Sequence, residues 1–208
     1  MLSLKFTPKS TQSFFITEKQ GLPLHNLALP ANHQFSPKRL VDFSTGRYCA
    51  IKALEQLGIQ DVIIPIGKDR EPIWPDGIVG SISHCDSLTG AIVAKKSDHI
   101  SLGLDIEEIG RVTSDLWDLV FTETEKNFLS GLSDEDKLVQ STAIFSIKEA
   151  FYKFQYPLTK TFLDFLDVEV LELNELTVLC EDIIFKTEIT KHKIIWFVKN
   201  NSVIAVIC

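Results

Sequence analysis

SLGLDIEEI, residues Ser101 to Ile109, is an apolar segment that carries acidic residues toward its end. Apolar residues alternate with small ones along it, which predicts a β-strand. Side chains two apart lie on one face of a strand, so Asp105 and Glu107 would share a face. Two carboxylates on one buried strand face require a nearby cation. The alternative interpretation is a strand that ends in a solvated acidic turn, since Glu108 follows.

FSIKEAFYK, Phe145 to Lys153, is the second stretch that this interpretation needs. It lies in a helical run in which Glu149 and Lys153 are four apart and share a face. A third carboxylate from Glu149 would complete an oxygen-ligand site for Mg²⁺, with room for water and phosphate. A surface ion pair between Glu149 and Lys153, stabilising by ~0.3–0.5 kcal/mol, would explain the same spacing.

The first half of the chain combines one helix with several strands. Ser36 and Pro37 resemble an N-cap followed by a first-turn proline, and they predict a helix that ends before Gly58. Residues 1 to 35 indicate a strand and loops. Further strands are predicted at Val62 to Ile66, Ile78 to Ile82 and Ala91 to Ala94.

The second half repeats a mixture of helix and strand. Thr122 and Glu125 form a capping-box pattern that opens a helix to about Leu129. A long helix is predicted from Ser133 to Tyr156, where Pro157 would stop it. Five strands follow, at Val168 to Leu173, Leu176 to Cys180, Ile183 to Phe185, Ile194 to Val198 and Val203 to Ile207. We therefore predict an α+β fold of two halves, residues 1–100 and 101–208.

Composition excludes several classes of protein. The 208 residues are 45% hydrophobic and carry a net charge of −7, which indicates a globular chain that is not a general nucleic-acid or membrane-surface binder. No apolar run reaches the ~18 residues of a membrane span, and the first residues lack a signal-peptide core. The cysteines show no metal-ligand spacing and are Cys49, Cys85, Cys180 and Cys208. We expect reduced thiols in a cytoplasmic protein without membrane insertion.

Several cations of the first half could bind an anion. Arg39 and Arg47 lie about 80° apart around the first helix, which a solvated basic face of an amphipathic helix would also explain. Lys68 lies in a turn, and loops with cations often bind anions. His84 follows Ser83 at the end of a strand, where a single histidine is more often a structural hydrogen-bonding residue than a catalyst.

Three motifs, in order and at the right spacing, resemble the signature blocks of 4'-phosphopantetheinyl transferases. They are WPDGIVGSISHCD (Trp74 to Asp86), GLDIE (Gly103 to Glu107) and FSIKEAFYK (Phe145 to Lys153). GRYCAIKALEQLG (Gly46 to Gly58) and the Trp-Pro turn are similar to the enterobactin-synthase type. The resemblance covers about residues 36 to 160, including PLTK after the last helix. Phe145 stands where the family often has tryptophan.

This resemblance implies an enzyme that transfers the phosphopantetheine arm of coenzyme A to a serine of an apo acyl or peptidyl carrier protein, releasing 3',5'-ADP. It implies two similar α+β halves face to face in one pseudo-dimeric monomer, with coenzyme A in the cleft between them. Asp105, Glu107 and Glu149 would bind Mg²⁺, and Asp105, Glu149 and Lys153 would be catalytic. Similar enzymes serve siderophore, non-ribosomal peptide or polyketide synthesis.

The resemblance also implies which side chains contact coenzyme A. The matching positions are Arg39, Arg47, Lys68, Ser83, His84, Lys148 and Lys153. Lys38 could take the role of Arg39, and Arg70 that of Lys68. The register between Ile66 and Glu71 stays open, because the length of this loop varies in the family. Two other functions remain: a non-catalytic relative that binds coenzyme A or carrier protein, and an unrelated Mg²⁺-dependent nucleotide hydrolase.

Overall fold

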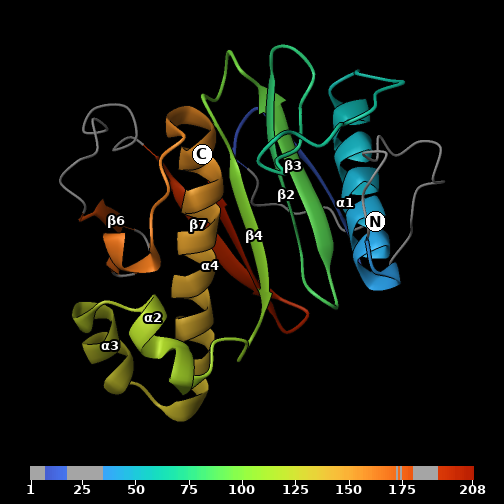
Figure 1. Cartoon of the computed structure of the whole chain (residues 1–208). Coiled ribbons are helices and arrows are strands. Elements are labelled where there is room, and N and C mark those ends of the chain that lie inside the picture. Colours follow the sequence, from blue (N-terminus) through green and yellow to red (C-terminus); the bar gives the residue numbers. More distant parts are fainter. Residues whose placement is uncertain (1–7, 18–34, 172, 174, 180–191) are drawn as a thin grey trace. The chain divides into compact units, whose positions relative to one another are not determined.

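The computed structural model of the 208-residue chain describes residues 8–17, 35–171, 173, 175–179 and 192–208 (Figure 1). The chain divides into two compact units, Met1–Leu102 and Gly103–Cys208. Each unit combines helices with antiparallel sheet, so the fold class is α+β, as predicted. No described helix is long and apolar enough to cross a membrane.

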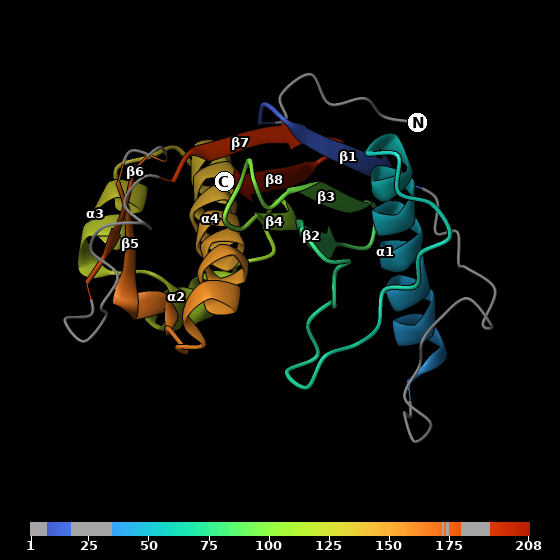
Figure 2. The ribbon, with the colours of Figure 1, turned by 90° about the horizontal axis from the view of Figure 1, so that it is seen from above.

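The first unit packs one helix on one sheet. The sheet has the order β1 (Thr11–Ile16), β3 (Thr89–Lys95), β2 (Ile78–His84), and both pairings are antiparallel. Helix α1 (Pro37–Gln56) runs along this sheet (Figure 2). The core between them is small and apolar, and consists of Cys49, Ala50, Ala53, Leu54, Ile64, Ala91 and Val93.

The ends of α1 follow the local sequence signals. The Ser36 side chain accepts a hydrogen bond from the backbone N–H of Arg39 at 3.3 Å, and Pro37 occupies the first turn. Gly58 follows the helix with a φ of +80°, a conformation that favours glycine. The predicted start and end of this helix are therefore confirmed.

The predicted strand from Val62 to Ile66 is wrong. Ile66 forms only an isolated bridge, with Pro72. The carbonyls of Ile64 and Pro65 instead accept hydrogen bonds from the side chain of Arg47. A proline also has no N–H to donate to a ladder, so this segment packs against α1 as an irregular connection.

The second unit is built on the predicted carboxylate strand. The sheet order is β4 (Gly103–Glu108), β8 (Ser202–Ile207), β7 (Ile194–Lys199), all antiparallel. Helix α4 (Asp134–Thr159) lies against β4 and β8. A Cβ on Gly103 would lie 1.8 Å from the carbonyl oxygen of Ala150, so only glycine allows this close approach of helix and strand.

Smaller elements surround α4. They are η2 (Ser114–Leu116), α2 (Trp117–Val120), α3 (Glu123–Ser130), η3 (Phe165–Asp167), β5 (Val168–Leu171) and β6 (Glu175–Val178). Figure 2 shows α4 between the β4–β8–β7 sheet and the paired strands β5 and β6. The largest apolar core of this unit therefore gathers on α4, with Ile144, Ile147 and Phe151 buried in it.

Helix boundaries in this unit are partly as predicted. The capping box of α3 is confirmed, because Thr122 Oγ1 accepts from the N–H of Glu125 and the Glu125 carboxylate accepts from the N–H of Thr122. Pro157 does not stop α4, which continues to Thr159. A proline in the last turn removes only one helical hydrogen bond, and the helix ends where Lys160 turns left-handed at φ 56°.

The C-terminal strands match the predicted positions, with bounds that differ by one or two residues. The strand predicted to reach Leu173 ends at Leu171, and the next one is Glu175–Val178. The two last strands are confirmed as β7 and β8. Cys180 and the strand predicted at Ile183 to Phe185 lie outside the described residues.

Candidate functional site

Asp105 is a buried acidic side chain of the second unit, held by two hydrogen bonds. It lies on β4 on the same face as Gly103, against α4, and is 2% exposed. Its Oδ1 accepts a hydrogen bond from Lys153 Nζ at 2.7 Å, and its Oδ2 accepts from Ser146 Oγ at 2.9 Å. A pair confined to the helix surface therefore does not describe Lys153, which connects α4 to β4.

The two other predicted metal ligands lie near Asp105. Burial and the neighbouring Asp105 raise the pKa of Glu107 to about 7, while Lys153 and Arg111 oppose this rise. Burial also raises the pKa of Glu149; Lys153 lowers it and Asp105 adds to the rise. The structure therefore gathers Asp105, Glu107 and Glu149 into one electrostatically coupled group.

Burial is the first cause of the raised pKa values of Glu107 and Glu149, because it disfavours their ionised forms. The donors are carboxylate oxygens, which Mg²⁺ prefers. Across the described residues, no group of three or more His, Cys, Asp or Glu side chains is arranged for a metal ion. Lys153 supplies the nearby cation in this arrangement.

Arg47 of the first unit is largely a structural residue. It is 6% exposed, its Nε donates to the carbonyl of Ile64 at 3.0 Å, and its Nη2 donates to that of Pro65 at 3.3 Å. Its guanidinium lies over the Phe43 ring at 4.5 Å, and burial lowers its pKa to about 10. These bonds use two of the five N–H donors of the guanidinium, and the other donors could reach an anion. The contact of Arg47 with an anion therefore stays a prediction.

The other predicted cations of the first unit lie at the surface. Arg39 is exposed in the first turn of α1, and Lys68 is exposed in the irregular connection after it. His84 is exposed at the end of β2 and follows the buried Ser83. An ion pair of 2.9 Å between Lys38 and Asp86 brings the start of α1 to the turn after His84. This ion pair therefore connects the first turn of α1 to the turn that follows β2.

Lys148, predicted to contact coenzyme A, is held by hydrogen bonds inside the second unit. Its Nζ donates to Glu125 Oε2 at 2.7 Å, to the Phe165 carbonyl at 2.8 Å and to the Val120 carbonyl at 2.9 Å. An ammonium has three donors, and all are used internally. Glu125 also accepts from the N–H of Val170 at 2.7 Å. Lys148 is therefore half of a buried ion pair.

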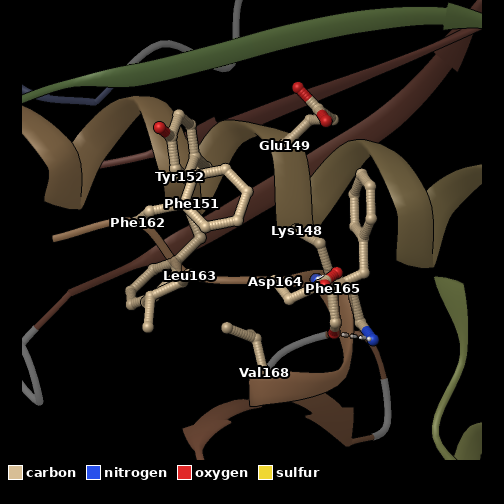
Figure 3. A pocket seen from close by; sticks show the side chains of 9 residues that line it. All are labelled: Lys148, Glu149, Phe151, Tyr152, Phe162, Leu163, Asp164, Phe165 and Val168. Atoms are coloured by element: carbon tan, nitrogen blue, oxygen red, sulfur yellow. Dashed lines mark hydrogen bonds between the residues drawn. The ribbon is translucent and has the colours of Figure 1, made fainter. Parts of the chain in front are cut away.

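A pocket of about 200 Å³ lies in the second unit beside Glu149 (Figure 3). It is mostly apolar, and its lining consists of Lys148, Glu149, Phe151, Tyr152, Phe162, Leu163, Asp164, Phe165 and Val168. Figure 3 shows the Lys148 and Glu149 side chains leaving α4 in different directions. Sequence reasoning missed this pocket, although two of its aromatic residues lie inside the helical motif and two follow it in the run FLDF.

Two family models match the chain. One, described as 4'-phosphopantetheinyl transferase N-terminal domain, matches residues 30–94. The other, described as 4'-phosphopantetheinyl transferase superfamily, matches residues 101–207, about half of the chain. The chain belongs to the 4'-phosphopantetheinyl transferase superfamily. The resemblance found in the three motifs is thereby confirmed, and the second match includes Asp105, Glu107, Glu149 and Lys153.

Curated relatives agree with this family. The chain is 40% identical over 135 residues to 4'-phosphopantetheinyl transferase Svp of Streptomyces mobaraensis, covering 64% of this chain and 55% of Svp. It is 36% identical over 133 residues to PptT of Mycobacterium tuberculosis, covering 64% and 58%. It is 31% identical over 169 residues to enterobactin synthase component D of Escherichia coli K12, covering 80% and 76%.

The matches to Svp and PptT cover little more than half of those relatives' lengths. The solved holo-[acyl-carrier-protein] synthase of Thermotoga maritima is similar over 51% of this chain and 60% of its own, at 21% identity. The TM-score of this match is 0.40.

Proposed function

We propose that this protein transfers the 4'-phosphopantetheine arm of coenzyme A to a serine hydroxyl of an apo acyl or peptidyl carrier protein. The observation that carries the proposal is the coupled group of Asp105, Glu107 and Glu149, with Lys153 bound to Asp105 at 2.7 Å. In this family-matched unit the carboxylates would hold a metal and Lys153 would bind phosphate, beside an apolar pocket.

The residues of the second unit would bind the diphosphate and the arm. Asp105, Glu107 and Glu149 would hold Mg²⁺, which when bound neutralises charge on the diphosphate oxygens. Lys153, a partly exposed lysine, would donate to a diphosphate oxygen. The pocket beside Glu149 would take the pantetheine chain, whose methyl-bearing and methylene groups suit its apolar lining.

Residues of the first unit would bind the nucleotide end. The 3'-phosphate is a dianion, and the exposed cations Arg39 and Lys68 could pair with it, with His84 as a further hydrogen-bond partner. Arg47 would add its uncommitted donors while it holds the connection after α1 in place. A hydrolase without a 3'-phosphate in its substrate would not need this set.

The proposed reaction exchanges a phosphoanhydride bond for a phosphodiester bond. The serine Oγ of the carrier attacks the phosphorus that bears the pantetheine arm, and a new O–P bond forms. The bond from that phosphorus to the bridging oxygen breaks, and 3',5'-ADP leaves with the electron pair. The serine proton passes to Glu149, directly or through water, because Glu149 is a carboxylate that lines the pocket.

Intact-mass measurement tests this proposal. The protein is incubated with coenzyme A, Mg²⁺ and an apo carrier protein, and the carrier should gain the mass of one phosphopantetheine group. Asp105→Asn should abolish the gain. Glu108→Gln is the matched control, because Glu108 is the next carboxylate of β4 and alternation directs it to the other face.

Other outcomes separate the competing functions. Binding of coenzyme A without any mass gain on several carriers would indicate the non-catalytic relative. Release of 3',5'-ADP without a carrier adduct would indicate a hydrolase. The relatives named as enterobactin synthase component D lead us to propose a carrier of siderophore or other non-ribosomal peptide synthesis as the first one to try.

A further inference from the structure

Gln155, a buried side chain of α4, closes a ring of three hydrogen bonds with the chain that follows the helix. Its Nε2 donates to the carbonyl of Thr161 at 3.1 Å, and its Oε1 accepts from Thr159 Oγ1 at 2.7 Å. Thr159 Oγ1 in turn accepts from the backbone N–H of Thr161 at 2.9 Å. Both backbone groups of Thr161 are therefore held against α4.

Lys148 holds the other end of the same segment. It lies seven residues before Gln155, which is two helical turns, so both side chains leave the same side of α4. Its Nζ donates to the carbonyl of Phe165 at 2.8 Å, a bond that is drawn in Figure 3. The Phe145 and Phe165 rings, 5.3 Å apart, add a contact at this end.

The segment between these two points forms one wall of the pocket. Phe162, Leu163 and Asp164 line it, opposite Phe151 and Tyr152 of α4. The segment 161–165 is therefore attached to α4 at both of its ends, at Thr161 and at Phe165.

We propose that Gln155, Thr159 and Lys148 are positioning residues that fix the segment 161–165, and that this wall sets which groups on the coenzyme A thiol the protein accepts. The inference rests on the proposed function, in which the arm enters this pocket. Release of one attachment gives the wall slack, so Leu163 and Phe162 can withdraw from the arm. The kcat/KM value for thioesters with bulky acyl groups then rises relative to the value for free coenzyme A.

The test compares two substrates on each variant. Carrier loading is followed by intact mass with free coenzyme A and with a coenzyme A thioester of an aromatic acid, and the ratio of kcat/KM values is taken. This ratio does not depend on the fraction of folded protein, which a merely structural effect would change. Thr159→Val removes two bonds of the ring with little change of shape.

We expect Thr159→Val to raise the ratio in favour of the thioester by about tenfold, the lower end of what one methylene decides in a fitted apolar pocket. Gln155→Leu should shift the ratio in the same direction. Thr161→Val is the matched control, since it keeps both backbone bonds of Thr161 and should leave the ratio unchanged. Lys148 is not substituted in this test, because its removal would leave the buried Glu125 carboxylate without its counter-ion.

The outcomes distinguish this inference from the proposed function. If the wild-type protein loads the carrier but Thr159→Val and Gln155→Leu keep its ratio, the inference is wrong and the function stands. An equal rise in Thr161→Val would also overturn the inference, because the ring would not be the cause. No loading by the wild-type protein from either substrate would overturn the proposed function itself.

Discussion

Removing the ammonium of Lys148 should destabilise the second unit strongly. In Lys148→Met the apolar stem is retained, but Glu125 stays behind with a side chain that is 0% exposed. Glu125 keeps its bonds from the N–H groups of Val170 and Thr122, at 2.7 and 2.8 Å, and loses its counter-ion. The carbonyls of Val120 and Phe165 also lose their donor.

The magnitude follows from this stranded charge. Breaking one partner of a buried ion pair costs about 3–5 kcal/mol of unfolding free energy. For a protein of 208 residues, each 1 kcal/mol lost from the free energy of unfolding lowers the melting temperature by about 2–4 °C. We therefore expect a decrease of roughly 6–20 °C. Scanning calorimetry of the purified variant measures it directly.

Two further variants make the result specific. Lys137→Met removes a lysine of α4 whose partner Asp134 is fully exposed, and it should shift the melting temperature little. Adding Glu125→Gln to Lys148→Met removes the stranded charge and should recover about 1–3 kcal/mol. The reasoning is refuted if the melting temperature of Lys148→Met equals that of Lys137→Met within experimental error. It is also refuted if Glu125→Gln destabilises the Lys148→Met variant as much as it destabilises the wild-type protein.

Three other predictions concern the proposed reaction. Glu149→Gln should retain most Mg²⁺-dependent coenzyme A binding in calorimetric titrations but lose transfer in single-turnover assays. Asp105→Ala should lose both binding and transfer. If the transfer rate of Glu149→Gln is within about tenfold of the wild-type rate, a difference of ~1.4 kcal/mol in the barrier, Glu149 is not the base. Lys68→Ala should weaken coenzyme A by about 1.5–3 kcal/mol and leave dephospho-coenzyme A unaffected, and equal losses would remove Lys68 from the 3'-phosphate site. Because the chain carries a net charge of −7, loading of an acidic carrier should fall only mildly with added salt, and a steep loss of carrier affinity at physiological ionic strength would contradict this.

The sequence predicted what depends on neighbours along the chain. Ser36 and Pro37 start α1, and the Thr122 capping box starts α3, because a cap needs only residues within one helical turn. Alternation in β4 placed Asp105 and Glu107 on one face for the same local reason. The spaced motifs were also sufficient to find the family.

Tertiary contacts decided which of these polar side chains are available. Lys148 and Lys153 belong to the same helix and look alike in sequence, yet Lys148 ends in a buried pair with Glu125 and Lys153 reaches Asp105. Arg47 resembled a surface cation, but carbonyls 17 and 18 residues away hold it inside the first unit. The position of a lysine or arginine along a helix indicates the face on which its side chain lies. The partner of that side chain depends on segments that are distant in sequence.

The pocket wall depends on the fold in the same way. In the sequence, Gln155 is a polar residue two positions before Pro157. The restriction that a proline places on the residue before it predicts that α4 ends at Tyr156. The helix instead continues to Thr159, because Pro157 in the last turn removes only one helical hydrogen bond. That extra length brings Thr159 to Gln155 and so fixes Thr161 beside the pocket. The sequence by itself determined the elements and the family of this protein, and the burial of a few polar side chains decided the shape of its pocket.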